Sequence, residues 1–504
     1  MHHIKGQQRN QLQMICLDQL VAQDNFIRII DLFVDAIDLK SFGIKNVTTN
    51  DEGRPPYHPG ILLKLYLYGY KYGVRSSRKL EYQAQVNLEV RWLLNEQTPS
   101  NRTIASFRQH HSKAFHQIFR KFVYLLKQAE LIEGETIAID SFKVRGQNSL
   151  KNNFNEKKIA RHLEYIDGKV AEYEQALDAA DTTDARIALE GKIATQAQRK
   201  EAYQSLREQL VESGQEQIST TDPEAKAVIL HRGVVNVGYN IQASVDAKNK
   251  LITGFDTGDV NDTNALAPMA TTLKQDLGVD GFHVLADKGY HTGEQLKQCA
   301  EENIVTFVSP KESASNDQDI FALRLFTYDT QRNSYTCPAG EILTTKGTWH
   351  AHSGKKGKAA FRFQRYSTTA CKQCLIRAKC TKSKANGRNI DRSEYADVIA
   401  ENSRRVKENP DYYRQRQQLA EHPWGTLKRQ WGFDHVLTRG KTKVLGEVSL
   451  AFIGYNLTRC ARICGSVNKF KQLIYSIVNR NKPCFFASKS HFRALNHLKT
   501  KMAA

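Results

Sequence analysis

Long hydrophobic runs are missing from this 504-residue sequence: no apolar stretch reaches the roughly 20 residues that a helix needs to cross a bilayer. The first residues, Met1 to Arg9, also lack the apolar segment of a signal peptide. Both absences argue against a membrane or exported protein and predict a cytoplasmic one. Cysteines are kept reduced in that compartment, so the nine present here are not expected to form disulfides.

Acidic residues are missing from two long stretches. Residues 353–390 contain eleven Lys and Arg without one acid, and no Asp or Glu follows Glu447. Over the whole chain, 73 Lys and Arg face 53 Asp and Glu, which leaves a net charge of +20. One basic run is often only a solvated surface, but two such runs in a strongly basic chain indicate a polyanionic partner.

The length predicts two to four structural units, of which the first is helical. Pro59 is well placed to begin a helix, and further helices are expected over 77–94 and 100–126. Basic residues cluster around these helices: Arg75, Arg78, Arg102, Arg108 and Lys113. We interpret residues 1–130 as a helical DNA-binding domain of the helix-turn-helix kind, with a packing or dimerisation bundle as the alternative.

A pair of helices is expected to interrupt the core after a first strand within 131–148. From Ile159 to Leu177, apolar residues recur in alternating steps of four and three, which is a heptad seam. A looser apolar series returns over 189–210. Residues 149–235 are therefore interpreted as an insertion that forms an antiparallel helical hairpin. The sequence leaves open whether it packs on its own chain or on a partner's.

Strands and helices of an α/β core resume after the hairpin. The expected elements are strands over 238–246 and 251–255, a helix over 264–277, a strand over 283–286, a helix over 293–302 and a strand over 304–308. With the first strand placed before them, this is the order of a ribonuclease H-like fold, a mixed β-sheet flanked by helices.

Two aspartates of this core follow predicted strands, and a glutamate lies on a later helix. Asp140 and Asp287 each end a short, mostly apolar run, and Asp287 directly precedes Lys288-Gly289-Tyr290. We expect both aspartates to project from strand ends at the edge of the sheet. Glu421 lies on a later helix, and Lys428 follows seven residues on, which is two helical turns and therefore the same face.

Three carboxylates that face one another repel strongly unless they share metal ions. In-line cleavage of a phosphodiester is helped by two divalent ions about 3.5–4 Å apart, and Mg²⁺ prefers oxygen ligands. Asp140 is assigned as the bridging ligand of two Mg²⁺ (or Mn²⁺) ions, with Asp287 holding one ion and Glu421 the other. Glu447 is a rival for Glu421, but it lies in an apolar helical run where a glutamate commonly pairs with an arginine.

The segments around these three carboxylates resemble the bacterial insertion-sequence transposases of the DDE class. The run Tyr57–Phe107, the cysteine-bearing insertion and Gly446–Arg459 extend the resemblance over nearly the whole chain. It implies a ribonuclease H-like catalytic core behind an N-terminal helical domain. The signature of these transposases is Tyr-x2-Arg-x3-Glu-x6-Lys, and here Tyr413-x2-Arg416 is followed by one residue more before the glutamate.

The resemblance implies DNA contacts along the helix that carries Glu421. Lys428 is expected to reach a phosphate, and Tyr413 and Arg416 are candidates to hold the strand end. The extra residue turns those two by about 100° relative to Glu421. Trp424 is a candidate to stack on an unpaired base, with burial in the core as the alternative.

Four cysteines form a cluster, in which Cys337 precedes Cys371-x2-Cys374-x5-Cys380. In a reducing compartment this pattern is more typical of a metal site than of disulfides. It predicts one structural Zn²⁺, with a reduced cluster that binds no metal as the alternative. The other five cysteines look unrelated to this cluster: Cys16, Cys299, Cys460, Cys464 and Cys484. Of these, Cys460 and Cys464 are expected to be buried on one helix face.

These features predict a transposase that binds terminal inverted repeats, cleaves DNA with water and joins the 3′-OH ends to target DNA. The alternatives are a ribonuclease H-like nuclease without strand transfer and a domesticated DNA-binding protein. Pairing two ends predicts a homodimer in the synaptic complex, with the nucleoid as the expected location. The expected domains are the N-terminal domain 1–130, the core 131–148, 236–309 and 401–460, the hairpin insertion 149–235, the basic Cys-rich insertion 310–400 and a basic helical tail 461–504.

Overall fold

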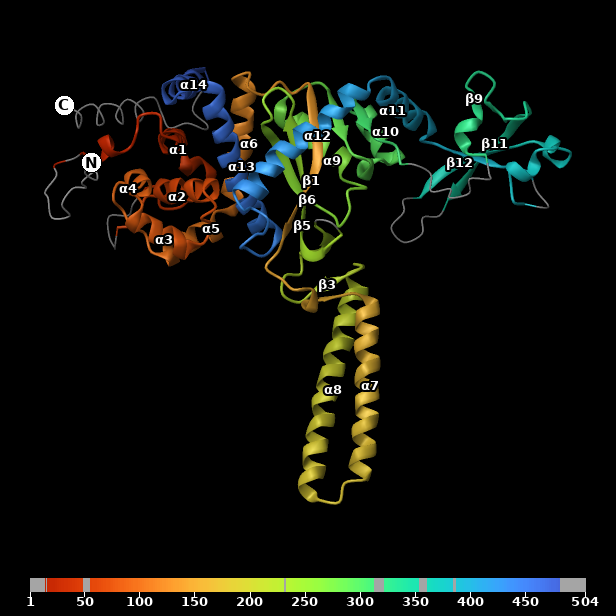
Figure 1. Ribbon diagram of the computed structural model, residues 1–504, viewed down its shortest axis with the longest axis horizontal. Helices are drawn as coiled ribbons and strands as arrows, with labels where there is room; N and C mark the ends of the chain where they lie inside the picture. The colour runs from red at the N-terminus through yellow and green to blue at the C-terminus, as the bar shows by residue number, and fades with distance from the viewer. Residues whose placement is uncertain are drawn as a thin grey trace, which may run out of the picture. The chain divides into compact units, whose positions relative to one another are not determined.

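The computed structural model describes residues 14, 16–48, 55–230, 233–311, 321–352, 360–383 and 387–480. They belong to two compact units (Figure 1). The first unit comprises residues 1–262, 272–279 and 417–504, and the second comprises 263–271 and 280–416. None of the described helices is long and apolar enough to cross a membrane.

The N-terminal region is helical, as predicted. Its elements are η1 (Leu17–Leu20), α1 (Phe26–Ala36), η2 (Leu39–Phe42), α2 (Pro59–Lys71), α3 (Ser77–Val86), α4 (Leu88–Leu93), α5 (Asn101–His110) and α6 (Ser112–Gln128). The two longer helices expected here are each broken once, at Asn87 and at His111. Asn87 leaves the helical region, and its side chain accepts a hydrogen bond from the Val90 N–H at 3.2 Å, so it caps α4 instead of continuing α3.

Helix α13 (Lys441–Cys464) is the central helix of the first unit, and α14 (Val467–Arg480) follows it. It is buried around most of its circumference and packs against α2, α6 and strand β6. The apolar helical run expected around Glu447 is therefore present as part of this helix. Cys460 is buried as expected, whereas Cys464 is only partly covered. The tail beyond residue 480, including Cys484, lies outside the described residues.

The sheet of the first unit is antiparallel. Its strands are β1 (Thr136–Arg145), β4 (Lys226–Ile229), β5 (Val235–Asp246) and β6 (Ile252–Gly258), and β5 pairs with the other three. Asp140 faces Ala243 in the middle of β1, not at its end as expected, because the strand continues through the buried Phe142 and Val144. Gly238 of β5 permits this pairing, since a Cβ there would lie 2.1 Å from the Val144 carbonyl oxygen.

The insertion after β1 is the predicted antiparallel hairpin, formed by α7 (Glu156–Asp178) and α8 (Thr183–Glu212). At its base lie η3 (Leu150–Asn152) and the paired strands β2 (Asn153–Phe154) and β3 (Ile218–Ser219). A small core of Phe154, Ile159 and Leu210 joins the helices to this base. The two helices pack on each other, so the seam is filled by the chain itself.

The second unit carries the remaining core elements in the predicted order. They are α9 (Leu266–Leu277), which begins in this unit, β7 (Phe282–Ala286), η4 (Lys288–Tyr290), α10 (Gly293–Glu301), β8 (Ile304–Val308) and α11 (Ala396–Glu408). Strands β7 and β8 pair in parallel, whereas β1, β4, β5 and β6 pair in antiparallel fashion, so this α/β fold contains both strand directions, as expected. The buried Asn402 of α11 accepts from the Val308 N–H and donates to the Val308 carbonyl, which ties α11 to β8.

The basic insertion is more ordered than its polarity suggested. It contains η5 (Leu323–Leu325), β9 (Thr327–Asp329), β10 (Ser334–Thr336), β11 (Ile342–His352), β12 (Phe361–Ser367), η6 (Thr369–Lys372), η7 (Arg377–Lys379) and β13 (Ile390–Ser393). The five strands form an antiparallel sheet in the order β13-β12-β11-β10-β9. A cluster of five apolar residues forms its core: Phe326, Tyr335, Leu343, Tyr366 and Ile390.

Candidate active site

Asp140 is the first residue of the candidate site. It is half-buried on β1, and its Oδ1 accepts a hydrogen bond from the Ser141 N–H at 2.8 Å. Side chains two residues apart on a strand share a face, so Asp140 lies on the same face as Phe142. That face is the one to which the Lys428 side chain comes.

Lys428 lies beside Asp140 within the first unit. Its Nζ is 4.8 Å from the centroid of the Phe142 ring. Burial lowers the pKa of Lys428 to about 8, and the opposing attraction of Asp140 and Asp434 does not offset it. Lys143 lowers the same pKa further. The site therefore contains a half-buried ammonium group next to the first predicted catalytic carboxylate.

Glu421 and Lys428 come from one helical segment whose geometry changes between them. Helix α12 (Pro410–Trp424) continues as a π-helix, η8 (Gly425–Gln430). Pro423 has no N–H to donate to the preceding turn, and a π segment is a frequent accommodation at functional sites. Glu421 is exposed and accepts a hydrogen bond from Gln417 Nε2 at 3.0 Å.

The rival carboxylate Glu447 already has hydrogen-bond and ion-pair partners within the first unit. It is fully buried and accepts hydrogen bonds from the Leu437 N–H, the Thr438 N–H and the Thr438 hydroxyl at 2.9–3.1 Å. Arg75 completes the set, with its Nη1 at 3.5 Å from Glu447 Oε1. A carboxylate satisfied in this way has a structural role, and this favours Glu421 as the third ligand.

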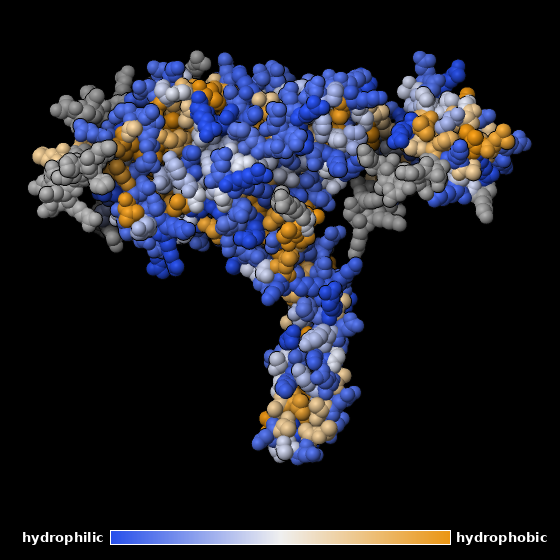
Figure 2. Space-filling view, in the orientation of Figure 1, coloured by the Kyte–Doolittle hydropathy of each residue, from blue (hydrophilic) through white to orange (hydrophobic). Residues whose placement is uncertain are grey.

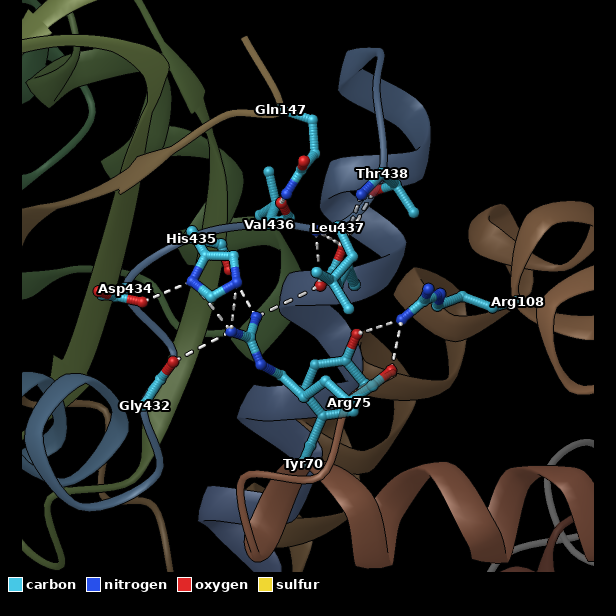
Figure 3. A network of polar contacts seen from close by, with 11 residues as sticks. Tyr70, Arg75, Arg108, Gln147, Gly432, Asp434, His435, Val436, Leu437 and Thr438 are labelled. Carbon is cyan, nitrogen blue, oxygen red and sulfur yellow. Dashed lines mark hydrogen bonds and ion pairs between the residues drawn. The ribbon is translucent and has the colours of Figure 1, made fainter. Parts of the chain in front are cut away.

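Two arginines that we expected to contact DNA belong to the same network. Arg75 donates to the backbone carbonyls of Gly432 and His435, and Arg108 donates to the Arg75 carbonyl and the Tyr70 hydroxyl (Figure 3). Arg75 and Arg108 are only 6% and 8% exposed. The expectation was wrong for these two, because their guanidinium groups tie α2 and α5 to the segment before α13. The other three are exposed: Arg78, Arg102 and Lys113.

Asp287 lies in the second unit, directly after β7 as predicted. Its Oδ1 accepts the Gly289 N–H at 2.5 Å and so caps η4. The Tyr413 hydroxyl donates to the carbonyl of the preceding residue, Ala286, at 3.2 Å. Tyr413 thus holds the strand end that presents Asp287, and Arg416 is half-buried on the same helix.

Trp424 packs within the protein. Its ring lies 5.0 Å from that of Phe142 and 6.1 Å from that of Phe452. This is the packing alternative that the sequence left open, and stacking of Trp424 on DNA stays a prediction. Asp262, a few residues after β6, makes side-chain contacts that the sequence did not reveal. It accepts hydrogen bonds from the amides of Asn240 and Gln242 on β5.

The four clustered cysteines all line one pocket in the second unit, and none of them is in a disulfide. In the part of the chain that the structure describes, no group of three or more His, Cys, Asp and Glu side chains is arranged to hold a metal ion as it stands. Neither the carboxylates nor the thiols therefore form a closed coordination shell in this conformation.

Comparison with known proteins adds two family matches. Residues 15–110 match the Transposase domain (DUF772), and residues 336–461, which contain Glu421 and Lys428, match the Transposase DDE domain. No curated protein matches the chain. Among solved structures, a cryo-EM structure of the piggyBac transposase synaptic complex with hairpin DNA aligns at 8% identity and a TM-score of 0.31, over 90% of this chain and 78% of that one. That likeness is too weak to carry weight, but both matched domains are transposase domains, and the chain is accordingly a DNA transposase of the DDE class.

Proposed function

We propose that this transposase binds the terminal inverted repeats of an insertion sequence, cleaves DNA at them with water, and joins the freed 3′-OH ends to target DNA. Asp140, Asp287 and Glu421 would hold the two Mg²⁺ or Mn²⁺ ions. The donor set fits these ions, because all three ligands are carboxylates and such cations prefer oxygen. When bound, the ions activate the attacking water and stabilise the leaving oxygen.

One observation supports this assignment above the others. The segment that carries Glu421 also brings the half-buried Lys428 ammonium next to Asp140 on β1. A cation held beside the carboxylate can contact the phosphate that approaches the ions, and low exposure strengthens that attraction. Glu447, the competing carboxylate, has its oxygens bound by backbone N–H groups, a hydroxyl and Arg75.

The residues of the chain have separable tasks in this proposal. Lys428 neutralises a phosphate oxygen, and Tyr413 orients the strand end at Asp287 through the Ala286 carbonyl. Arg416 is proposed to contact the DNA strand near the site. Each of these residues positions DNA or a ligand, whereas the three carboxylates supply the metal oxygens.

The test is cleavage of end-containing DNA by Asp140→Asn, Asp287→Asn and Glu421→Gln. Each amide keeps the shape of its side chain but loses the charge that holds metal, so we expect a loss of at least about 100-fold, the equivalent of about 2.7 kcal/mol. End binding should persist, because it depends mainly on phosphate contacts elsewhere. Asp411→Asn is the matched control, since Asp411 is exposed on α12 and pairs only locally with Arg414.

Retention of full cleavage by Glu421→Gln would remove Glu421 from the assignment. Joining is tested separately with pre-cut ends, where strand-transfer products are expected. Hydrolysis without joined products would identify a nuclease instead. DNA binding without any cleavage in the presence of Mg²⁺ or Mn²⁺ would identify a DNA-binding protein that has lost its catalytic function.

The proposed reacting assembly contains two DNA ends and two copies of the chain. Sedimentation of the protein with end-containing duplexes should show a complex of that composition. A complex of one chain with one end that nevertheless joins both ends to a target would contradict the homodimer.

A further inference from the structure

Four cysteines of the second unit take no part in the proposed cleavage. They come from three segments of the basic insertion: Cys337 follows β10, Cys371 and Cys374 lie in and after η6, and Cys380 follows η7. All four line a single pocket that is partly open to solvent. The Cys380 thiol interacts electrostatically with each of the other three.

The backbone holds the cysteines around this pocket. Cys337 begins a tight turn in which its N–H donates to the Glu341 carbonyl and its own carbonyl accepts from the Gly340 N–H, both at 2.9 Å. Gly340 has a φ of +81°, which favours glycine at that place. On the other side, the Cys380 N–H donates to the Arg377 carbonyl at 2.9 Å. Gly387 packs so closely on Cys371 that a Cβ would lie 2.4 Å from the cysteine Cβ.

Apolar burial does not explain the order of the segment that carries three of these cysteines. Among the described residues from Ser367 to Asn389, none is buried, and Leu375 is fully exposed. Its helical parts, η6 and η7, are four and three residues long. Short 3₁₀ turns have little stability of their own. A cross-link to the neighbouring sheet would hold such a segment where apolar packing cannot.

We propose that Cys337, Cys371, Cys374 and Cys380 bind one structural Zn²⁺ as a tetrathiolate. Four thiolates and one Zn²⁺ carry two net negative charges, and Arg377 and Arg388 line the same pocket to offset them. The thiols surround the pocket but do not converge as they stand. Thiols without an ion pack as small apolar groups, as Cys337 and Cys380 do against the cluster around Tyr335.

Binding of the ion would turn the thiols into the pocket at about 2.3 Å from the metal. It would couple the free energy of coordination to the order of the basic segment. The segment itself would then be held next to β10 and β11. Its exposed lysines would be fixed in place with it: Lys372, Lys379 and Lys382. This proposal is independent of the carboxylate site, because the thiols and the carboxylates are different residues with different metals.

The experiment uses the full-length protein purified under reducing conditions without chelator. Elemental analysis should find about one zinc per chain in the wild type. Cys371→Ser with Cys374→Ser should abolish that zinc. Cys16→Ser with Cys464→Ser is the matched control, because it also removes two thiols and leaves the pocket intact, so its zinc content should equal that of the wild type.

A second measurement keeps the proposal open to refutation if the serine variant folds poorly. Wild-type protein stripped of metal and given Co²⁺ should show the charge-transfer absorption of cobalt thiolates, which added Zn²⁺ then abolishes. Proteolysis between residues 367 and 389 should be faster without metal. Less than about 0.2 zinc per chain together with no cobalt–thiolate absorption would overturn the proposal, and so would zinc content unaffected by the paired serine substitution.

Discussion

Lys428 shows how the fold changes the chemistry of one side chain. A free lysine is protonated throughout the physiological range, with a pKa near 10.4. Burial beside Phe142 lowers the Lys428 pKa to about 8, so the group loses its charge as the pH rises through that value. Arginine at the same position would stay protonated.

We therefore expect the single-turnover cleavage rate of Lys428→Arg, divided by that of the wild type, to rise as the pH increases from about 7 to 9. The wild-type contact to phosphate is present below the pKa and is lost above it, whereas the guanidinium contact persists. Lys428→Ala is the control, and its rate relative to the wild type should be lowest at the acidic end. A ratio for Lys428→Arg that does not change with pH would show that the Lys428 charge is not used.

Arg75 and Arg78 are three residues apart and have opposite environments. Arg75 is buried against Glu447, whereas Arg78 is exposed on α3. Removing one partner of a buried charged pair costs about 3–5 kcal/mol, while an exposed substitution usually changes stability by less than about 0.5 kcal/mol.

Chemical denaturation should therefore show a large loss of stability for Arg75→Ala and almost none for Arg78→Ala. The Arg75 substitution leaves Glu447 with its backbone and hydroxyl donors but without the guanidinium group of its ion pair. Similar unfolding midpoints for the two variants would contradict the structural role of the network around Glu447.

Helix α3 is the element of the N-terminal region best suited to contact DNA. Its exposed face carries Arg78, Lys79 and Tyr82 at positions that lie on one side of the helix. Helix α5 packs beside it, where Asn101 Nδ2 donates to Glu81 Oε2 at 2.7 Å. Point substitutions test this face better than removal of residues 1–130, because α2 and α6 cover α13.

We expect Arg78→Ala with Lys79→Ala to weaken binding to end-containing DNA and to reduce the slope of log affinity against log salt by about 1.8, the value for two lost phosphate contacts. Arg186→Ala with Lys192→Ala on α8 removes the same charge from another exposed surface and is the control. Equal losses in the two double variants would indicate a general effect of charge and would argue against recognition by α3.

The hairpin α7–α8 is nearly separate from the packing of the rest of the molecule. Its buried residues within the helices are Ile159, Ile166 and Leu210. Its surface is mostly hydrophilic, with apolar residues gathered near the turn between the helices (Figure 2). Because its contacts are largely internal, the hairpin can be removed without opening the core of the first unit.

A short glycine-containing linker in place of residues 156–212 should give a chain that keeps the melting temperature of the wild type and loses helical signal in circular dichroism. Strands β2 and β3 would still bring the two ends of the deletion together, through the Asn153–Ser219 and Phe154–Ile218 pairs. Aggregation or a strongly lowered melting temperature would show that the hairpin stabilises the core.

Much of the fold was open to prediction because it depends on local signals. The heptad seam from Ile159 predicted the hairpin, Pro59 predicted the start of α2, and the apolar run before Asp287 predicted β7. The break at Asn87 was missed because a capping side chain can end a helix that propensity alone would continue. The break at His111 has no such side-chain cap. Asp140 was expected at the end of β1, but the strand continues beyond it. Phe142 and Val144 are buried by long-range packing, and the sequence around a polar Asp140 does not reveal that burial.

The sequence by itself determined the residue types of the proposed site. The segments around Asp140, Asp287 and Glu421 can be matched to those of transposases without coordinates. It also determined the charge that predicts a DNA partner. Only the tertiary structure decided which charged groups are free to act. It buried Arg75 with Glu447 and placed Lys428 beside Asp140, because burial and partner choice depend on segments that lie hundreds of residues apart in the chain.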